Sequence, residues 1–527
     1  MAVKGNKKKE TSAKDFKAVL WASADKLRSQ MDAAEYKHLV LGLIFLKYIS
    51  DTFIEQQNNV LKMVSDPDSD YYLGENSSDH QEALEDRDYY TQENVFWVPV
   101  EARWESLRNQ AKQANIGQLI DKALVVIENE NSTLRGKLDK RFGAAQLEPG
   151  RMGELVDLIS TIGFGEGGNS ADVLGEVYEY FLGQFASKEG KKGGQFYTPA
   201  HVVKTLVAVL SPHKGRVYDP CCGSGGMFVQ SERFVESHGG RRDDISIYGQ
   251  ESNPTTWRLA AMNLAIRGFA ADLGPEPRDT FAKDHHSDLK FDYILANPPF
   301  NISDWGGEKY ESNPRWVFGI PPVGNANFAW LQHILWKLRP GGQAGVVLAN
   351  GSLSSNTNGE GKIREEMVRK DVVEVIVSLP GNLFLNTPVP ACLWFFTQDK
   401  TQRGRDRRGE TLFIDACQMG KMVNRKERVL TAEDISKIAE TVHSWRNENE
   451  YDDVAGFCHN SKFEEIEKNN FVLTPGRYVG AVEEEKDSEL FDDKMKRLTS
   501  LLKEQQEKGM KLDQQIAENL ERIGYGF

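Results

Sequence analysis

The chain has 527 residues, of which 39% are hydrophobic and 27% are charged, and its formal net charge at pH 7 is -13. This length exceeds one ordinary hydrophobic core, so two or three domains are expected. No run of about 18 apolar residues is present, so no membrane span is expected, and the acidic balance argues against a protein that grips DNA alone. Five cysteines without zinc-site spacing predict no disulfide framework, and a reducing cytoplasm is the expected compartment.

Residues 1–160 are predicted to form a helical N-terminal domain. Their apolar residues recur at spacings of three and four, the period of an amphipathic helix, and no strand-like alternation is evident. Arg103–Asn129 has this character, whereas the polar and acidic stretch Asp66–Asp88 is expected to be a loop. The glycine-rich break Gly163–Asn169 then marks the passage to a second domain.

Between residues 161 and 480, short apolar runs typical of strands alternate with helical patterns. This alternation predicts an α/β, Rossmann-like domain with a mostly parallel sheet and helices on both faces, whose ligands bind at the carboxyl ends of the strands. The strand candidates are Val217-Tyr218, Ile245–Tyr248, Tyr293–Leu295, Ala344–Leu348, Val372–Val377, Leu393–Phe396 and Leu412–Ile414. The helix candidates include Asp172–Phe185, Pro199–Leu210, Thr255–Arg267 and Phe328–Leu338.

The last segment, residues 481–527, is highly charged and predicted to be helical. A narrow apolar stripe on a polar helix is typical of a docking face. The segment is expected either to dock on a partner or to pack back on its own chain, and its sequence favours neither. The stripes are Phe491, Met495, Leu498 and Leu502, then Leu512, Ile516, Leu520 and Ile523.

Two basic segments, Lys188–Lys192 and Lys400–Arg408, stand out from the acidic chain. Such segments are more often solvated loops than nucleic-acid contacts, and we interpret both as solvated loops. His285 and His286 have no carboxylate or cysteine neighbours at ligand spacing. They are therefore predicted to be surface residues and to bind no metal.

Asp219–Gly226 (DPCCGSGG) follows the first strand candidate and precedes a helical pattern. Glycines in such a turn let backbone N–H groups approach a ligand without a Cβ in the way. No Walker lysine follows, and the G-x-G-x-x-G spacing of dinucleotide sites is absent. A nucleoside cofactor without a pyrophosphate is therefore expected, with Cys221 and Cys222 as small packing residues beneath the turn.

Three further positions lie where such a cofactor needs contacts. Glu251 ends the next strand candidate, where a carboxylate holds a ribose diol. Asp279 precedes a later strand candidate and can accept a hydrogen bond from an adenine amino group. Gln195–Ala200 lies at a predicted helix start, where Thr198 is expected to be the N-cap and Pro199 the first helical residue.

Asn297-Pro298-Pro299-Phe300 follows directly after an apolar strand candidate. Amines on aromatic bases are poor nucleophiles because the lone pair is delocalised into the ring. The side-chain oxygen of Asn297 and the carbonyl of Pro298 can each accept one N–H of such an amine, and the prolines stiffen the loop. Phe300 offers a face for stacking a base, which must leave a duplex to reach it. The aromatic-rich stretch Asn301–Asn327 would line this pocket or form a lid on the domain.

The order of these motifs resembles that of the gamma-class N6-adenine DNA methyltransferases. It resembles still more closely the modification subunit of type I restriction–modification systems. Leu20–Leu27 and Tyr36–Phe53 look like the helical N-terminal domain of that subunit, and Asn470–Val479 looks like the end of its catalytic domain. The resemblance therefore covers nearly the whole chain.

This resemblance implies a site-specific adenine-N6 DNA methyltransferase, with S-adenosylmethionine as the cofactor and no metal. Asn at position 297, rather than Ser, favours adenine over cytosine N4. The catalytic residues would be Asn297, Pro298, Pro299 and Phe300. The cofactor contacts would be Gln195, Phe196, Tyr197, Thr198, Pro199, Ala200, Asp219, Gly223, Ser224, Gly225, Gly226, Glu251 and Asp279.

The resemblance also implies partners. Two modification subunits would join one specificity subunit that reads double-stranded DNA, and a restriction subunit is a further partner that it allows. The C-terminal helix is expected to dock on the specificity subunit. Two alternatives stay open at this point: a methyltransferase of the same chemistry acting on RNA or a protein glutamine, and a non-catalytic structural subunit.

Overall fold

The computed structural model describes ten stretches of the chain: residues 16–28, 31–75, 77–148, 150–162, 170–189, 198–384, 389–425, 427–447, 451–481 and 491–522. Contact clustering divides the chain into two compact units, Met1–Val479 and Gly480–Phe527. The break Gly163–Asn169 and most of Lys188–Lys192 lie outside the described residues. Within these stretches no helix is long and apolar enough to cross a membrane.

The second unit contains one described helix, α16 (Phe491–Arg522), as the sequence pattern predicts. Five side chains of its two predicted stripes are more than two-fifths exposed: Met495, Leu498, Leu502, Leu512 and Ile516.

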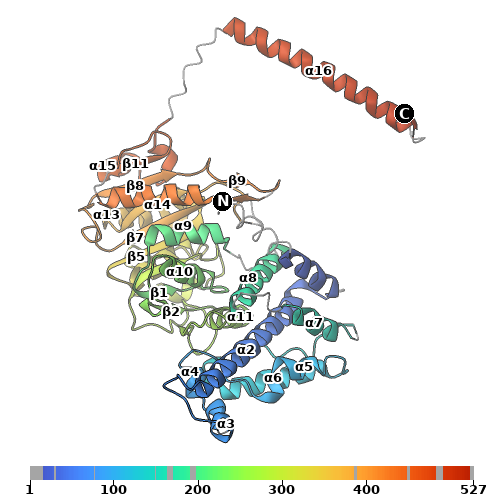
Figure 1. Ribbon diagram of the computed structural model, residues 1–527. Coiled ribbons are helices and arrows are strands. Elements are labelled where there is room, and N and C mark those ends of the chain that lie inside the picture. The colour runs from blue at the N-terminus through green and yellow to red at the C-terminus, as the bar shows by residue number, and fades with distance from the viewer. Residues whose placement is uncertain are drawn as a thin grey trace. The chain divides into compact units, whose positions relative to one another are not determined.

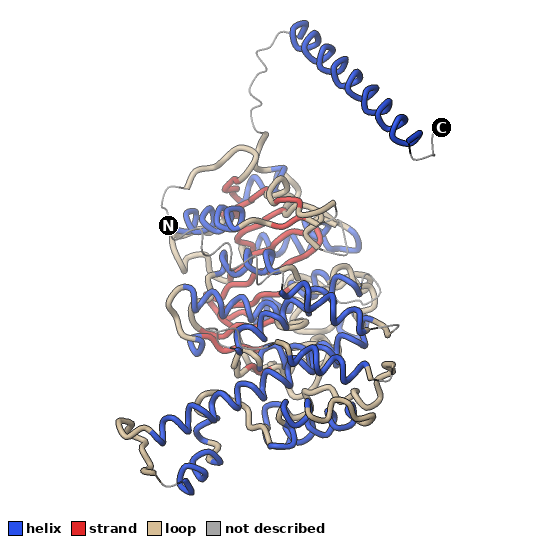
Figure 2. Tube along the Cα trace, turned by 45° about the vertical axis from the view of Figure 1, so that its right-hand side comes forward, coloured by secondary structure: helices blue, strands red, loops and turns tan. Residues whose placement is uncertain are grey.

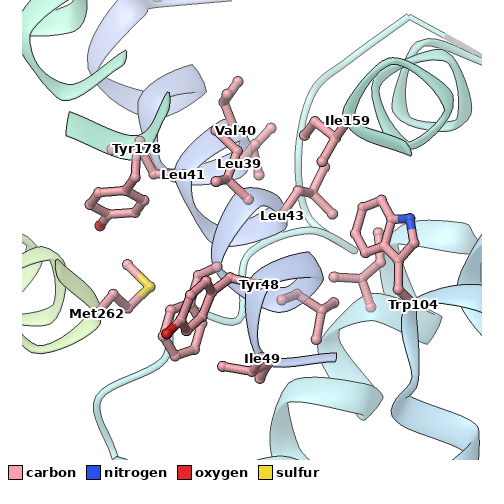
Figure 3. Close-up of a cluster of buried hydrophobic side chains, with 14 of the residues drawn as sticks. Leu39, Val40, Leu41, Leu43, Tyr48, Ile49, Trp104, Ile159, Tyr178 and Met262 are labelled. Atoms are coloured by element: carbon pink, nitrogen blue, oxygen red, sulfur yellow. The ribbon is translucent and has the colours of Figure 1, made fainter. Parts of the chain in front are cut away.

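Helix α2 (Ala33–Ser65) is the axis of the helical N-terminal part of the first unit. Asp32 caps it by accepting a hydrogen bond from the N–H of Ala34. Its residues are buried without interruption from Tyr36 to Asp51, as expected for a helix enclosed by others. Figure 3 shows that enclosure, with Trp104 and Ile159 on one side of α2 and Tyr178 and Met262 on the other.

The neighbouring helices correct two predictions. The stretch predicted to be a loop contains α3 (Ser77–Glu85), because Ala83 packs on Val60 and Val64 of α2. The predicted continuous helix Arg103–Asn129 is broken between α5 (Trp104–Arg108) and α6 (Ile116–Glu130). Gly153 of α7 (Arg151–Ser160) lies against the backbone of Ala111 at the break. The helices here are α3, α4 (Asp88–Thr91), α5 (Trp104–Arg108), α6 (Ile116–Glu130), α7 (Arg151–Ser160) and α8 (Ser170–Glu189).

A nine-stranded sheet forms the rest of the first unit, in the order β11-β8-β6-β7-β5-β4-β1-β2-β3. Every strand candidate overlaps one of its strands, but the sequence reading missed the two-residue β3 and the polar edge strand β11. The strands are β1 (Gly215–Asp219), β2 (Ile245–Gly249), β3 (Ala271–Asp272), β4 (Phe291–Ala296), β5 (Leu338–Ala349), β6 (Val373–Ser378), β7 (Ala391–Thr397), β8 (Glu410–Asp415) and β11 (Cys458–Lys462). A separate two-stranded hairpin joins β9 (Lys421–Met422) to β10 (Arg428–Val429).

Helices cover both faces of the sheet, because successive strand residues point to opposite sides (Figures 1 and 2). Leu393 and Phe395 of β7 belong to one core, and Trp394 and Phe396 to the other. The first core includes α9 (Ala200–Leu210), α10 (Gly226–Ser237), α11 (Pro254–Ala265) and α14 (Ala432–Asn447). The second includes α12 (Asn327–Lys337), α13 (Glu360–Arg369) and α15 (Phe463–Lys468). Short 3-10 turns are η1 (Val100–Ala102), η2 (Ser132–Leu134), η4 (Arg242–Asp244), η5 (Gly307–Tyr310), η6 (Asn350–Leu353), η7 (Thr357–Gly359) and η8 (Pro475–Arg477).

The direction of the strands decides where each loop lies. β7 is antiparallel to both β5 and β6, so β6 and β8 run the same way as β1, β2, β4 and β5. The carboxyl ends of these parallel strands share one edge of the sheet, which we call the carboxyl edge. The chain therefore leaves β8 at the carboxyl edge, whereas the loop from β7 to β8 lies at the opposite edge.

Candidate active site

The glycine turn connects β1 to α10 at the carboxyl edge. Asp219 ends β1, and its buried carboxylate accepts a hydrogen bond from the N–H of Cys221 at 3.0 Å. Gly223 and Gly225 have φ values of 55° and 81°, which glycine adopts without strain. The turn therefore depends on these two glycines for its path. Cys222 is 5% exposed and packs in the core beneath, as predicted.

Glu251 is fastened to the glycine turn. Its carboxylate accepts hydrogen bonds from the N–H of Gly223 at 3.1 Å and of Asn253 at 2.8 Å. Burial raises the pKa of Glu251, although these backbone bonds act in the opposite direction. Burial also raises the pKa of Asp219 to about 7, and the neighbouring Glu251 adds to the shift. Two carboxyl groups thus lie close together at the ends of β1 and β2.

Two buried polar residues connect the segment around Asp279 to Asp219 and Glu251. They are Gln250 and Thr280, to which the sequence analysis assigned no role. The side-chain amide of Gln250 donates to the carbonyls of Arg278 (3.1 Å) and Lys283 (2.7 Å). The hydroxyl of Thr280 donates to the carbonyl of Pro220 at 2.6 Å. Asp279 lies between these anchors, and its carboxylate accepts from the N–H of Phe281. The structure therefore brings Asp219, Glu251 and Asp279 to one wall of the carboxyl edge.

The prediction that His285 and His286 lie on the surface is wrong for His286, which is 4% exposed. Its Nε2 lies 3.0 Å from the carbonyl oxygen of Gly249, and its ring packs edge-on against Tyr218 and Tyr248. His286 can be buried because the two tyrosine rings pack against it and the carbonyl at the end of β2 is a partner for its ring nitrogen. His285 is half-buried.

Asn297 leaves β4 at the same edge. Its Nδ2 donates to the hydroxyl of Thr198 at 2.7 Å, while its Oδ1 is buried without a hydrogen-bond partner among the described residues. Thr198 is therefore not the predicted N-cap of α9: Pro199 occupies that position, and no side chain caps the helix. Gln195, Phe196 and Tyr197 lie outside the described residues. The structure thus joins Thr198, a predicted cofactor residue, directly to the predicted catalytic asparagine.

The rest of the motif is held in place by neighbours. Pro298 is buried, and the ring of Phe300 lies edge-on to that of Phe384, with 5.9 Å between centroids. Asn301 has a φ of 54° and exchanges two hydrogen bonds with Asn327 at the start of α12. These contacts fix the path of the loop that follows Asn297.

The loop that follows the motif packs on the wall that contains Asp279, which favours a lid over a pocket lining for its tryptophans. Trp305 and Trp316 lie against Phe281. Arg315, 7% exposed, donates to the carbonyls of Thr280 (3.2 Å) and Phe281 (2.9 Å). Its guanidinium also lies 3.1 Å from Nδ1 of the buried His333, whose pKa is lowered to about 3 by burial and by that charge. Arg315, which the sequence reading missed, therefore joins the loop to the residues beside Asp279.

The basic segment Lys400–Arg408 lies at the opposite edge, and the prediction of a solvated loop is wrong for its buried members. Lys400 pairs with Asp371 at 2.6 Å, and Arg407 pairs with Glu374 at 3.1 Å. Both cations are almost fully buried. Burial favours the neutral form of Glu374, but Arg446 and Arg407 hold the pKa of this carboxyl below its usual value. Lys400 and Arg407 are thus neutralised inside the fold, whereas Arg403 and Arg408 of the same segment are exposed.

Comparisons with known proteins agree with this geometry. Residues 169–487 match the N-6 DNA methylase family model, and residues 16–159 match the HsdM N-terminal domain. This chain belongs to the N-6 DNA methylase family. The HindI type I restriction enzyme methylase subunit of Haemophilus influenzae is 48% identical over 81% of this chain and 100% of its own length. The MjaIX methylase subunit of Methanocaldococcus jannaschii is 38% identical over 97% of this chain and 92% of its own length.

Solved structures extend the comparison to three dimensions. A type I restriction–modification methyltransferase subunit from Streptococcus thermophilus superposes with a TM-score of 0.73 at 26% identity. The match covers 89% of this chain and 99% of that one. The predicted fold is confirmed: an α/β methyltransferase sheet with a helical N-terminal part. The predicted function is confirmed as well, since the chain is an N6 DNA methylase of the type I restriction–modification class.

Proposed function

We propose that this N6 DNA methylase binds S-adenosylmethionine at the wall formed by the glycine turn, Glu251 and Asp279, and methylates an adenine held by Asn297, Pro298 and Phe300. The observation that carries this proposal is the buried Oδ1 of Asn297, which has no partner among the described residues. A buried acceptor without a donor is costly, so a bound N–H group is the natural partner.

The residues present fit this cofactor. A Cβ placed on Gly223 or Gly226 meets nothing within 4 Å, so the turn has an open side on which a ligand can lie. The proposed contacts in residues 195–200, 219–226, 251 and 279 include three carboxylates and no lysine or arginine. That balance suits a nucleoside with a cationic sulfonium and disfavours a nucleotide with phosphates. Ser224, Gly225 and Ala200 would approach the ligand through the backbone.

Within this site, each catalytic residue has a role that follows from its contacts. Oδ1 of Asn297 would accept one N6–H of adenine, and the carbonyl of Pro298 the other, which turns the lone pair of the amine outward. The hydrogen bond from Nδ2 to Thr198 would fix the orientation of the side-chain amide, so that Oδ1 is the atom left to accept from the adenine amine. Phe300, supported by Phe384, would stack on the base, and Pro299 would limit movement of the loop. When bound, the cofactor supplies the electrophilic methyl group.

We further propose the division of labour along the chain: residues 1–160 as a helical domain, 161–480 as the catalytic domain and 481–527 as a docking tail. The exposed apolar side chains of α16 support docking on another helix. The partner would be a specificity subunit, with two copies of this chain to one copy of it. A restriction subunit would join the complex in the cytoplasm. The HindI and MjaIX relatives, both methylase subunits of type I restriction enzymes, support this assembly.

The test is methyl transfer by the full chain co-expressed with its specificity subunit. Labelled S-adenosylmethionine is supplied with DNA, and the DNA is digested to nucleosides. We expect labelled N6-methyladenine with the specificity subunit and none without it. Label in protein or RNA, or none with any partner, would contradict the proposed substrate.

A further inference from the structure

The β9–β10 hairpin, residues 419–430, leaves the body of the protein at the carboxyl edge. It begins just after β8 ends at Asp415, and Figure 1 shows β9 extending outward beyond α14. Its two strands pair Arg428 with Met422 and Val429 with Lys421. No function assigned above uses it.

The base of the hairpin is anchored beside the catalytic motif. The N–H of Arg428 donates to the carbonyl of Asn382 at 2.8 Å, and its guanidinium donates to the carbonyl of Met419 at 3.1 Å. Asn382 is two residues from Phe384, so the chain between them spans at most about 7 Å. Phe384 in turn contacts Phe300. The hairpin is thus linked to the proposed base-stacking residue through one short loop.

The tip of the hairpin presents cations and apolar groups to solvent. Lys421 and Arg425 are exposed, and neither forms an ion pair with any residue that the structure describes. The carboxylate of Glu427 is engaged within the hairpin by the amide of Asn424 at 2.9 Å. Met422 and Val423 are 40% and 57% exposed. In a chain with a net charge of -13, this is a local surface suited to a polyanion.

We propose that the β9–β10 hairpin contacts the phosphate backbone of the DNA duplex next to the flipped adenine, through Lys421 and Arg425. This inference rests on the proposed function, since it takes DNA as the substrate. A two-stranded β-ribbon has the dimensions to follow a DNA groove, and phosphate contacts position a protein on the duplex. The hairpin would supply grip that the specificity subunit does not supply at the catalytic site itself.

The experiment compares the parent chain with the double variant Lys421→Gln/Arg425→Gln, each as the full chain in complex with its specificity subunit. Binding to a short fluorescent duplex of arbitrary sequence is measured between about 50 and 200 mM salt. We expect affinity at the lower salt to fall roughly tenfold or more, and the slope of log K against log salt to shrink by about 2. The matched control is Arg408→Gln, an exposed cation of the opposite edge, which should leave both unchanged.

Unchanged affinity and slope in the double variant would overturn the inference. Loss of the specificity subunit on co-purification would also overturn it, because the hairpin would then be a protein interface. Both side chains are exposed, so the double variant should melt at the parent's temperature. DNA binding is measured without methyl transfer, so failure of the proposed catalysis would appear separately, as absent label in the parent complex.

Discussion

Two segments with basic residues, Lys400–Arg408 and the β9–β10 hairpin, precede and follow β8. They differ in whether their cations are buried. In Lys400–Arg408, at the amino end of β8, three cations turn into the fold: Lys400 pairs with Asp371, Arg405 with Glu410 and Arg407 with Glu374. The hairpin after β8 keeps Lys421 and Arg425 in solvent. A basic segment in the sequence therefore does not identify a DNA-binding surface until the direction of the neighbouring strand shows at which edge of the sheet the segment lies. Buried ion pairs at the opposite edge stabilise the fold, whereas polar groups at the carboxyl edge form the proposed ligand site.

The largest effect on stability is expected at the opposite edge. Glu374→Ala would leave the guanidinium groups of Arg407 and Arg446 buried without their shared carboxylate. Breaking such a buried network costs about 3–5 kcal/mol of unfolding free energy. Chemical denaturation of the full chain measures it. Arg408→Gln is the control, since its partner Asp406 is exposed, and equal stability of the Glu374 variant and parent would refute the stated division between edges.

At the carboxyl edge, Asn297→Ala is expected to remove function and spare stability. The substitution deletes a buried acceptor that has no described partner and one hydrogen bond to the half-buried Thr198, so the fold loses little. Methyl transfer should fall by at least about 10²–10³-fold, the range for loss of one positioned hydrogen-bonding group. Cofactor binding, measured by calorimetry, should change little. A parallel loss of cofactor binding would contradict the role assigned to Asn297.

Arg315 lies at the carboxyl edge but is buried, so its variant should combine both effects. Arg315→Met leaves the carbonyls of Thr280 and Phe281 without their donor, and we expect a loss of about 1.5–3 kcal/mol in unfolding free energy. Because those carbonyls belong to the two residues that follow Asp279, the affinity for S-adenosylmethionine should fall, which separates this variant from Asn297→Ala. Arg315→Lys should be intermediate, since one ammonium cannot reproduce the planar fork. Unaltered cofactor affinity in both variants would show that the loop containing Arg315 does not support the proposed cofactor site.

The last expected effect is a pH dependence of stability. Burial raises the pKa of Asp219 to about 7, from an ordinary value of 3.8. Between these two values the native state holds a proton that the unfolded chain has released, so stability falls as pH rises through this window and levels off above about 7. Asp219→Asn retains an acceptor for the N–H of Cys221 and should flatten the curve. A variant curve parallel to the parent's from pH 4 to 8 would assign the slope to other groups, of which Glu251 is the nearest candidate.

The central strands and the motif positions were predictable, because buried parallel strands are apolar runs and their carboxyl ends gather the loops that follow. Other features carry no local signal. β11 contains His459 and Asn460 and looks like a loop, since only its pairing with β8 makes it a strand. Gln250 and Arg315 donate to backbone carbonyls of distant segments, so no residue near them in the sequence marks their role. The N-cap assigned to Thr198 failed because its hydroxyl serves Asn297 instead.

Helix α11 belongs to two interiors at once. Its Trp257 and Leu264 pack in the core of the methyltransferase sheet, whereas Leu259 and Met262 pack with α2 and α8 of the helical part (Figure 3). The N-cap of the same helix is Asn253, whose N–H donates to the carboxylate of Glu251. The boundary between the two regions that match family models, residues 16–159 and 169–487, is therefore not a boundary between separate hydrophobic cores. An exchange of the helical part would therefore also have to match the face of α11 that packs against it, on the helix whose N-cap is held by Glu251.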